Sequence, residues 1–269
     1  MKIVTWNVNS LKVRMPRVLE LLEQHRPDVL LLQETKSAAD AYPTLELEAA
    51  GYESVHHSAG RWAGVAVLAR SGLGIEEVGL GLPGEPDADE ARWVEAVIGD
   101  LRVISTYVIN GRALDSPFFA DKLRFLGAAA GRVAELREMG EKVVLAGDFN
   151  VTRDDRDVYD PVAFQGGTHV TAEERGALDA ILDRGGLLDS YRHLHDGPED
   201  VHYTWWDYRA GNFHKKLGLR IDYLLVSEAL GDRIADCHIE RDFRKGTKPS
   251  DHAPLVLELS WLQGLVRAF

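Results

Sequence analysis

The amino-acid sequence predicts an α/β protein built from two packed, mixed β-sheets with helices on their outer faces. Predicted strands and helices alternate in both halves of the chain, and the strands outnumber the helices, which fits two packed sheets better than a single parallel sheet. The chain has 269 residues, a length that one large α/β domain can occupy. It contains no internal repeat, low-complexity segment or long linker, so we expect a single domain over residues 1–269.

The first half of the chain supplies several of the predicted strands. Val18, Leu21 and Leu22 have the spacing of an amphipathic helix, which Pro27 ends. The apolar run that follows predicts a buried strand that ends in the acid Glu34. Closely spaced strands after it are expected to pair antiparallel. The predicted elements are a strand at 2–7, a helix at 16–24, a strand at 28–34, a helix at 43–50 and strands at 52–57, 65–69, 93–98 and 101–108.

The second half begins with a long helix. Ser116 and Pro117 are typical of a helix start, with serine as the cap and proline in the first turn, and the helix is expected to reach Glu138. An apolar run at 143–146 then predicts a buried strand that leads into a Gly-Asp-Phe-Asn turn. A capping box at 171–174 opens a second helix. We also expect a loop at 70–92 and strands at 203–206, 219–226, 234–239 and 255–259.

The composition indicates an acidic globular protein with locally basic segments. The formal net charge is −12, which argues against a broad basic field for non-specific nucleic-acid binding. Basic residues gather at 12–17, at 214–216 with Arg220, and at 241–248, and these segments can grip phosphates if they share one face. Cys237 is the single cysteine, so no internal disulfide forms. Because the sequence shows no signal-peptide pattern and no apolar run of membrane-spanning length, we expect a soluble cytoplasmic protein with no membrane partner. We also expect a monomer.

Acidic side chains stand at or near the ends of three predicted buried strands. These are Glu34, Asp148 and Asp222, and a fourth acid, Asp251, precedes the last strand beside His252. Polar groups that leave a sheet together can converge, as they do at the strand ends of open α/β sheets. Carboxylate and amide oxygens without cysteine favour a hard cation such as Mg²⁺ or Mn²⁺. An imidazole held by a carboxylate on one nitrogen can face a substrate with the other.

Each of these residues also has an ordinary structural interpretation. Asp148 and Asn150 occur in a turn in which such side chains often bond their own backbone. Glu34 could be a solvated strand end, and Asp222 could pair with the nearby Arg220. Asp251 could cap a turn. The individual residues leave these alternatives open, whereas their joint pattern favours a site.

Six short blocks of the sequence resemble, in order, the motifs of one family. They are Thr5–Asn9, Leu32–Lys36, Gly147–Asn150, Thr204–Arg209, Leu219–Asp222 and Pro249–Pro254. Together they are similar to those of the exonuclease III family of apurinic/apyrimidinic (AP) endonucleases, which belongs to the endonuclease–exonuclease–phosphatase superfamily with DNase I-like folds. The resemblance extends from residue 2 to about residue 260 and implies a four-layer α/β sandwich.

The resemblance implies a DNA-repair enzyme. Its expected reaction is Mg²⁺-dependent hydrolysis of the phosphodiester 5′ to an abasic site, with Mn²⁺ as a substitute metal. The resemblance also implies 3′→5′ exonuclease and 3′-phosphatase or phosphodiesterase activity. The expected partner is double-stranded DNA that carries abasic sites or blocked 3′ ends.

Residue roles follow from the resemblance where the motifs match. The residues matched to catalysis and phosphate contact are Tyr107, Asn110, Asp148, Asn150, Asp222 and His252, with Asp222 as the partner of His252. Those matched to the metal or its surroundings are Asn7, Glu34, Asp148, Asn150, Asp251 and His252, with Glu34 as the main ligand.

Substrate recognition is expected from an apolar pocket and from basic residues. Trp205, Leu219 and Ile221 match a family pocket for the baseless sugar. Alternation along a strand places Leu219 and Ile221 on the face opposite to that of Asp222. The alternative interpretation, that these apolar residues only belong to the hydrophobic core, therefore stays open. The expected phosphate contacts are Lys215 and Arg220, together with Lys12, Arg14, Lys216, Arg244 and Lys248.

Two other classes of function remain open on the sequence. Phosphoinositide phosphatases, sphingomyelinase-like esterases and RNA deadenylases of the same superfamily share the catalytic residues, but the blocks around Trp205 and Leu219 favour DNA repair. A non-catalytic DNA-binding module would be expected to lack one of the key residues, and all of them are present.

Overall fold

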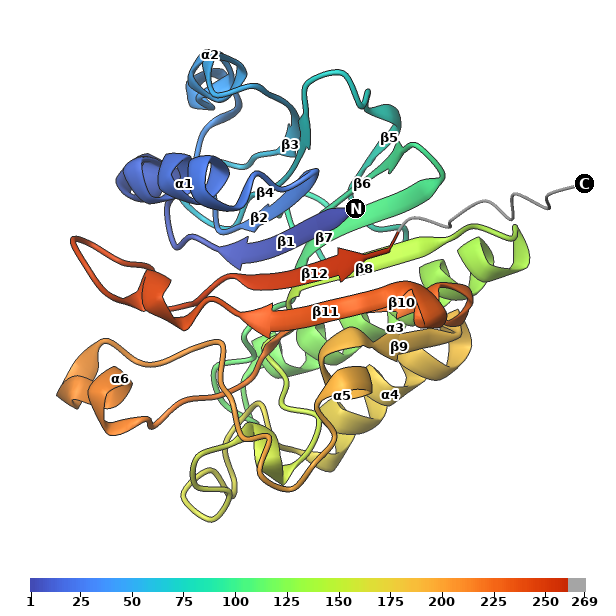
Figure 1. Cartoon of the computed structure of the whole chain (residues 1–269). Helices are drawn as coiled ribbons and strands as arrows, with labels where there is room; N and C mark the ends of the chain where they lie inside the picture. The colour runs from blue at the N-terminus through green and yellow to red at the C-terminus, as the bar shows by residue number, and fades with distance from the viewer. Residues whose placement is uncertain (261–269) are drawn as a thin grey trace, which may run out of the picture.

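Two six-stranded β-sheets pack face to face in the computed structural model, which describes residues 1–260 (Figure 1). The first sheet has the strand order β11-β12-β1-β2-β4-β3, and the second has the order β5-β6-β7-β8-β10-β9. Both sheets are mixed, because β1 and β2 are parallel, as are β7 and β8, whereas the other neighbouring strands are antiparallel. The predicted pair of packed mixed sheets is confirmed.

Each sheet combines strands from both halves of the chain. The first sheet contains β1 (Lys2–Asn7), β2 (Val29–Gln33), β3 (Tyr52–His57), β4 (Val65–Arg70), β11 (Ile234–Ile239) and β12 (Leu255–Leu259). The second contains β5 (Glu76–Leu80), β6 (Trp93–Ile98), β7 (Leu101–Tyr107), β8 (Val143–Asp148), β9 (Leu187–Asp189) and β10 (Asp222–Ser227). The α-helices are α1 (Leu11–His25), α2 (Thr44–Ala49), α3 (Pro117–Glu138), α4 (Ala172–Gly185), α5 (Ser190–Leu194) and α6 (Asn212–Lys215).

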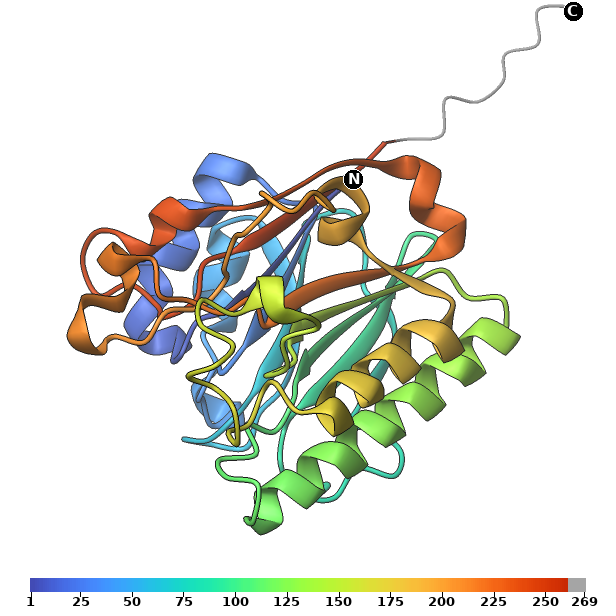
Figure 2. The same ribbon diagram turned by 90° about the horizontal axis from the view of Figure 1, so that it is seen from below.

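Helices cover the outer face of each sheet, which gives the fold four layers. On the first sheet, Val18 of α1 packs in one buried cluster with Trp6 of β1. On the second sheet, α3 and α4 lie side by side, and Phe125 of α3 belongs to the cluster beneath them (Figure 2). A third cluster fills the space between the sheets and includes Leu31 of β2 and Val144 of β8. The apolar strand runs of the sequence are therefore buried on both faces, as a four-layer sandwich requires.

The helices begin and end close to their predicted bounds, with α1 as the exception. It begins at Leu11, before the predicted start at Pro16, and includes the proline. The missing N–H of a proline weakens a helix, but buried Leu11 and Met15 on the inner face of this first turn offset that loss. Across residues 1–260, no helix has both the length and the apolar character needed to cross a bilayer.

Two short strands occupy segments for which the sequence predicts none. β5 lies within the predicted loop at 70–92, and Glu76, Glu77 and Val78 are exposed at the edge of the sheet. β9 has three residues, which are too few to show an alternating pattern. An exposed edge and a short length both remove the periodic signal on which the prediction depends.

One predicted strand is wrong, and its replacement shapes the site. Residues 203–206 form no strand; instead Trp205 makes isolated bridges with Leu219 and His252. Accordingly β10 begins at Asp222 and not at Leu219. The predicted antiparallel pairs β3–β4 and β6–β7 are confirmed, but β4 and β6 belong to different sheets.

Candidate active site

The ends of several strands converge at one edge of the packed sheets. Asn7 ends β1, and Glu34 directly follows the end of its parallel neighbour β2. Asp148 ends β8 and lies opposite Asp222, the first residue of β10. Tyr107, the last residue of β7, is the parallel partner of Asp148. Strand pairing thus gathers polar residues that lie far apart in the sequence.

Asn7 connects two carboxylates at the floor of this edge. Its Nδ2 donates to Glu34 Oε1 at 2.8 Å and to Asp148 Oδ2 at 2.9 Å, while its Oδ1 accepts from the backbone N–H of Asn9 at 3.0 Å. Glu34 has a φ of 51°, which is uncommon for a residue other than glycine, and its Oε2 lies 2.7 Å from Lys36 Nζ. Asn7 therefore orients both carboxylates through its amide nitrogen, and its predicted direct contact with a metal stays a prediction.

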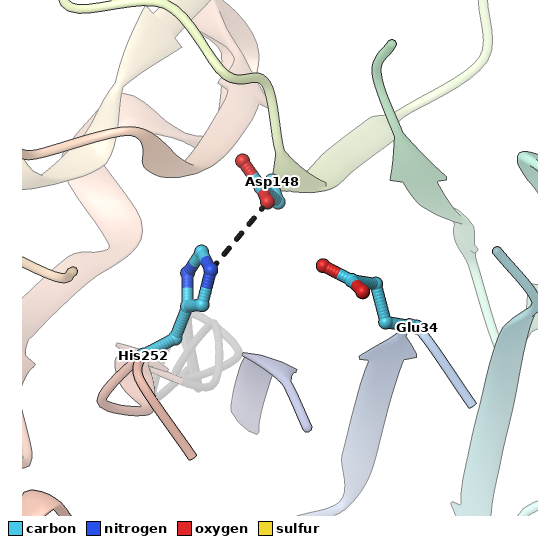
Figure 3. Close-up of side chains that lie close together, drawn as sticks. All are labelled: Glu34, Asp148 and His252. Atoms are coloured by element: carbon cyan, nitrogen blue, oxygen red, sulfur yellow. Dashed lines mark ion pairs between the residues drawn. The ribbon is translucent and has the colours of Figure 1, made fainter. Parts of the chain in front are cut away.

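His252 lies between two buried aspartates. Its Nδ1 is 2.8 Å from Asp222 Oδ2, and its Nε2 is 3.7 Å from Asp148 Oδ2. Figure 3 shows the imidazole facing Asp148, with Glu34 on the other side of that aspartate. Asp222 thus pairs with the histidine, as the resemblance implies, and not with its neighbour Arg220. One ring nitrogen is held by Asp222, and the other is turned toward the cavity.

Burial and neighbouring charges shift the pKa values of these groups in opposite directions. Burial raises the pKa of Asp148 to about 7, and the nearby His252 counteracts only part of that effect. Burial favours the neutral form of His252, but the carboxylates of Asp222 and Asp148 outweigh it and raise its pKa to about 10. Burial, with the charges of Glu34 and Asp148, raises the pKa of Tyr107 well above its ordinary value. The cluster therefore contains an imidazolium and a protonated phenol at neutral pH.

Asn150 is held in the turn that leaves β8. Its backbone N–H donates to Asp148 Oδ1 at 2.9 Å, and its Nδ2 donates to the Val108 carbonyl at 3.0 Å. Its Oδ1 accepts from Asn110 Nδ2 at 3.1 Å, so the two predicted phosphate-contacting amides touch each other. The turn requires Gly147, because a Cβ there would lie 1.9 Å from the Thr106 carbonyl oxygen.

Asp251 and Trp205 form one wall of the site. Asp251 accepts from Asn9 Nδ2 through Oδ1 and from Trp205 Nε1 through Oδ2, both at 3.0 Å. Trp205 in turn packs with Leu219 and Ile221, and all four residues line a cavity of about 180 Å³ together with the catalytic cluster. The predicted apolar pocket therefore adjoins the acids. Leu219 and Ile221 precede β10, where the backbone is irregular, so the strand alternation that would place them on the face opposite to Asp222 does not apply.

His169 lines the same cavity, although no sequence motif marks it. It is half-buried, has a φ of 77°, and its Nδ1 contacts the carbonyl of Asn150. Burial, together with nearby Lys122, lowers the pKa of His169 to about 4, so the imidazole is neutral. The capping box after it marks the start of α4 but gives no sign that the preceding loop turns back to the catalytic edge.

Two predicted phosphate contacts are wrong because their side chains are buried. Arg220 has no exposed surface (0%), and its guanidinium pairs with Asp157 at 2.7 Å and with Asp189 at 2.8 Å. Arg244 is 6% exposed and donates to the carbonyls of Ser250 and Trp206. Each guanidinium is occupied by acceptors inside the fold, so neither can reach DNA.

The remaining basic segments are neighbours at the surface. Lys12, Lys215 and Lys248 are exposed and lie outside the cavity. Arg17 of α1 donates to the Phe243 carbonyl at 3.3 Å, and Arg241 donates to the Phe213 carbonyl, next to His214, at 3.2 Å, so the three segments lie side by side. The predicted shared basic face therefore has a structural basis without Arg220 and Arg244.

The donor atoms at the catalytic edge suit a hard cation. Glu34, Asp148 and His252 each offer a ligand atom, and these atoms all lie within 4.8 Å of one another. Two of the three groups are carboxylates, the oxygen donors that Mg²⁺ and Mn²⁺ prefer. The contacts of His252 with Asp222 and its raised pKa favour a charged imidazolium, so its predicted contact with a metal stays a prediction.

Comparison with known proteins agrees with this arrangement. A model of the Endonuclease/Exonuclease/phosphatase family matches residues 4–252. The chain belongs to this family. Within the family it resembles exodeoxyribonuclease III of Haemophilus influenzae, with 32% identity over 96% of this chain and 99% of the relative.

Two solved structures of the family are also similar to this chain. One is a Neisseria 3′ phosphatase, NExo, bound to a product DNA hairpin, with 41% identity and a TM-score of 0.92 over 97% of this chain and 100% of that one. The other is an AP endonuclease from Archaeoglobus fulgidus, with 33% identity and a TM-score of 0.91 over the same shares of the two chains. The protein is thus a hydrolytic nuclease of the exonuclease III branch, with the DNase I-like fold that the motifs imply.

Proposed function

We propose that the protein is a Mg²⁺-dependent DNA-repair nuclease that removes groups and nucleotides from 3′ ends and cleaves the DNA backbone 5′ to abasic sites. The observation that carries the proposal is the convergence of Glu34, Asp148 and His252 in a cavity of about 180 Å³. That cavity is smaller than the 300–1,000 Å³ of ordinary ligand pockets, which suits a phosphate and a baseless sugar. The names of the relatives, an exodeoxyribonuclease, a 3′ phosphatase and an AP endonuclease, support the same chemistry.

Glu34 and Asp148 would hold Mg²⁺, and Mn²⁺ would substitute for it. The ion would polarise a phosphoryl oxygen and offset negative charge in the transition state. Asn7 aims both carboxylates at the same point through its two donor contacts. Asn150, Asp251 and His252 line the same cavity as the two carboxylates and would contact the ion or the bound phosphate.

The remaining cluster residues would act on the phosphate. His252, held by Asp222, would donate from Nε2 to a phosphoryl oxygen, since its raised pKa keeps the imidazole protonated. Asp148, whose Oδ2 lies 3.7 Å from His252 Nε2, would exchange a proton with the attacking water or the leaving oxygen. Asn150 and its partner Asn110 would orient the phosphate, and Tyr107 would donate from a phenol that stays protonated.

Substrate choice would depend on the wall opposite the acids. Trp205, Leu219 and Ile221 would contact a flipped-out sugar and exclude a base by volume. His169 narrows the cavity from the side of Asn150 and would favour a terminal phosphate over an internal abasic sugar. Exposed Lys12, Lys215 and Lys248 would contact the phosphates of the duplex. All of these residues come from one chain, so we propose an active monomer, at work in the cytoplasm.

Three duplexes test the proposal: one with a 3′-phosphate, one with an abasic site and one intact. We expect the first two to be hydrolysed with Mg²⁺ and to persist with EDTA. Poly(A) and inositol phosphates serve as alternative substrates, because related phosphoesterases share the catalytic residues. Turnover of either alternative in preference to the damaged duplexes would contradict the proposal.

A further inference from the structure

A fully buried ion pair lies behind the catalytic cavity, outside the six blocks that resemble the family motifs. Lys122 of α3 and Glu174 of α4 form it, and neither side chain has any exposed surface (0% for both). Burying two charges is costly unless hydrogen bonds satisfy their remaining donors and acceptors. The partners of this pair therefore show what it holds in place.

Lys122 uses its ammonium to fix the backbone of two cavity residues. Besides Glu174, its Nζ donates to the carbonyl of Asn150 at 2.6 Å and to the carbonyl of Asn110 at 3.3 Å. An ammonium has three N–H groups, so all of them are occupied. Asn110 and Asn150 are the two amides that touch each other in the cavity, and Asn150 has a φ of 52°. The ammonium thus binds the backbone carbonyls of both residues, and both residues line the cavity.

Glu174 extends the same support to the loop before α4. Its Oε1 accepts from the backbone N–H of His169 at 2.8 Å, and its Oε2 accepts from the backbone N–H and the hydroxyl of Thr171 at 3.1 and 2.9 Å. His169 also contacts the Asn150 carbonyl through Nδ1. One ion pair therefore ties three cavity-lining residues to the two outer helices.

We propose that Lys122 and Glu174 are positioning residues that set the phosphate-orienting geometry of Asn150 and Asn110 and the place of His169. The inference rests on the proposed function, because it assigns the orientation of a bound phosphate to those asparagines. Lys122 and Glu174 act through these residues and do not touch the substrate. Small displacements of orienting groups cost about 10²-fold in rate, so the effect falls on turnover.

The test uses variants of the full chain that separate positioning from stability. Lys122→Met keeps the length of the side chain and removes the ammonium, and Lys122→Met/Glu174→Gln also removes the unpaired carboxylate. The control is Arg102→Met/Glu95→Gln, a buried pair at the opposite end of β7 from Tyr107, with side chains 5% and 8% exposed. Turnover and KM are measured on a 3′-phosphorylated duplex with Mg²⁺, and stability by urea unfolding.

We expect kcat to fall about 10²-fold in both Lys122 variants, with KM changed by no more than about threefold, as for a group that acts in the transition state. The double variant should be the more stable of the two, because no uncompensated charge stays buried. The control should lose stability and keep its kcat. Wild-type kcat in the folded double variant, or an equal loss of kcat in the control, would overturn the proposal.

A second measurement does not depend on activity. The side-chain amide NMR signals of Asn110 and Asn150 are compared between the wild-type and double-variant proteins without substrate or metal. Displacement of these two signals, with the amide signals of the control unchanged, supports positioning. Identical signal positions in the wild-type and double-variant proteins would overturn the positioning proposal. This outcome can be told apart from failure of the proposed function, which would show as a wild-type protein that hydrolyses no DNA.

Discussion

Two buried clusters of charged side chains meet at the start of β10, and they differ in their balance of charge. The first contains two arginines and two aspartates: Arg192, Arg220, Asp157 and Asp189. The second contains three carboxylates and one imidazole: Glu34, Asp148, Asp222 and His252. The clusters adjoin, because only Ile221 separates Arg220 from Asp222. The backbone N–H groups of Ile221 and Asp222 both donate to the Thr204 hydroxyl.

Charge balance separates a structural role from a chemical one. Burial opposes ionisation of Asp157, but Arg220 and Arg192 outweigh burial and lower the pKa of this carboxyl. In the second cluster, burial raises the pKa of Asp148 to about 7, because His252 is shared with Asp222 and compensates only in part. The first cluster is satisfied within the protein. With Lys36 beside Glu34, the second still has three carboxylates against two cations next to a cavity, and a cation from solution can neutralise the remaining negative charge.

The largest expected effect is the loss of a carboxylate from the unbalanced cluster. Glu34→Ala should lower Mg²⁺-dependent turnover by about 10³-fold, because a metal supplies several kcal/mol of charge stabilisation, and should raise the Mg²⁺ concentration needed for half-maximal rate. Activity is titrated with Mg²⁺, and thermal unfolding checks the fold. Glu135→Ala, at a side chain that is 63% exposed, is the control. An unchanged Mg²⁺ response would remove Glu34 from the metal site.

Breaking the balanced cluster should act on stability first. Arg220→Met leaves two buried aspartates, Asp157 and Asp189, with Arg192 as the one cation that remains in the cluster. Loss of one partner of a buried pair costs about 3–5 kcal/mol of unfolding free energy. We expect kcat to fall by less than about tenfold in the folded variant, since neither aspartate partner of Arg220 lines the catalytic cavity. Urea unfolding and turnover are measured against Arg209→Met, whose side chain is 88% exposed. A stable variant with a large loss of kcat would reverse the roles assigned to the two clusters.

Within the unbalanced cluster, Asp222 should set the charge of His252. Asp222→Asn removes the largest anionic influence, so the pKa of His252 should fall from about 10 toward its ordinary value of 6.5. Because the folded-state pKa is raised, ionised His252 stabilises the fold fully below pH 6.5, and this contribution is lost as the pH rises through about 10. Nitrogen NMR of the imidazole in metal-free protein measures the titration, with exposed Asp242→Asn as the control. An unaltered midpoint would separate Asp222 from the histidine.

The smallest expected effect concerns the neutral side of the cavity. His169→Ala should raise the ratio of kcat/KM on an abasic duplex to that on a 3′-phosphorylated duplex by about tenfold, because added pocket volume admits an internal sugar. Metal dependence should be unchanged, since His169 lies outside the carboxylate cluster. Exposed His193→Ala provides the comparison. A ratio equal to that of the wild type would show that the imidazole does not limit entry.

Much of the fold and several site residues could be predicted because their signals are local. The apolar run before Gly147 marks a buried strand, and the acid that follows must then stand at the strand's end. Ser116 and the capping box at 171–174 mark helix starts through contacts within a few residues. Glu34 and Asp148 were therefore predictable as strand-end acids, whereas Asp222 falls inside the predicted strand at 219–226 and is the first residue of β10 in the structure. The resemblance to the family indicated that the three acids meet.

Only the tertiary structure decided which charged side chains are paired inside the fold and which are exposed to solvent. Arg220 and Lys215 look alike as basic residues near one motif, yet packing places the first among aspartates and the second in solvent. His169 and Lys122 belong to a loop and a helix outside the six blocks that resemble the family motifs, yet both contact the carbonyl of Asn150. Strand and cap preferences depend on adjacent residues, whereas the partners of a charged group depend on distant segments that the packing of two sheets and their helices brings together.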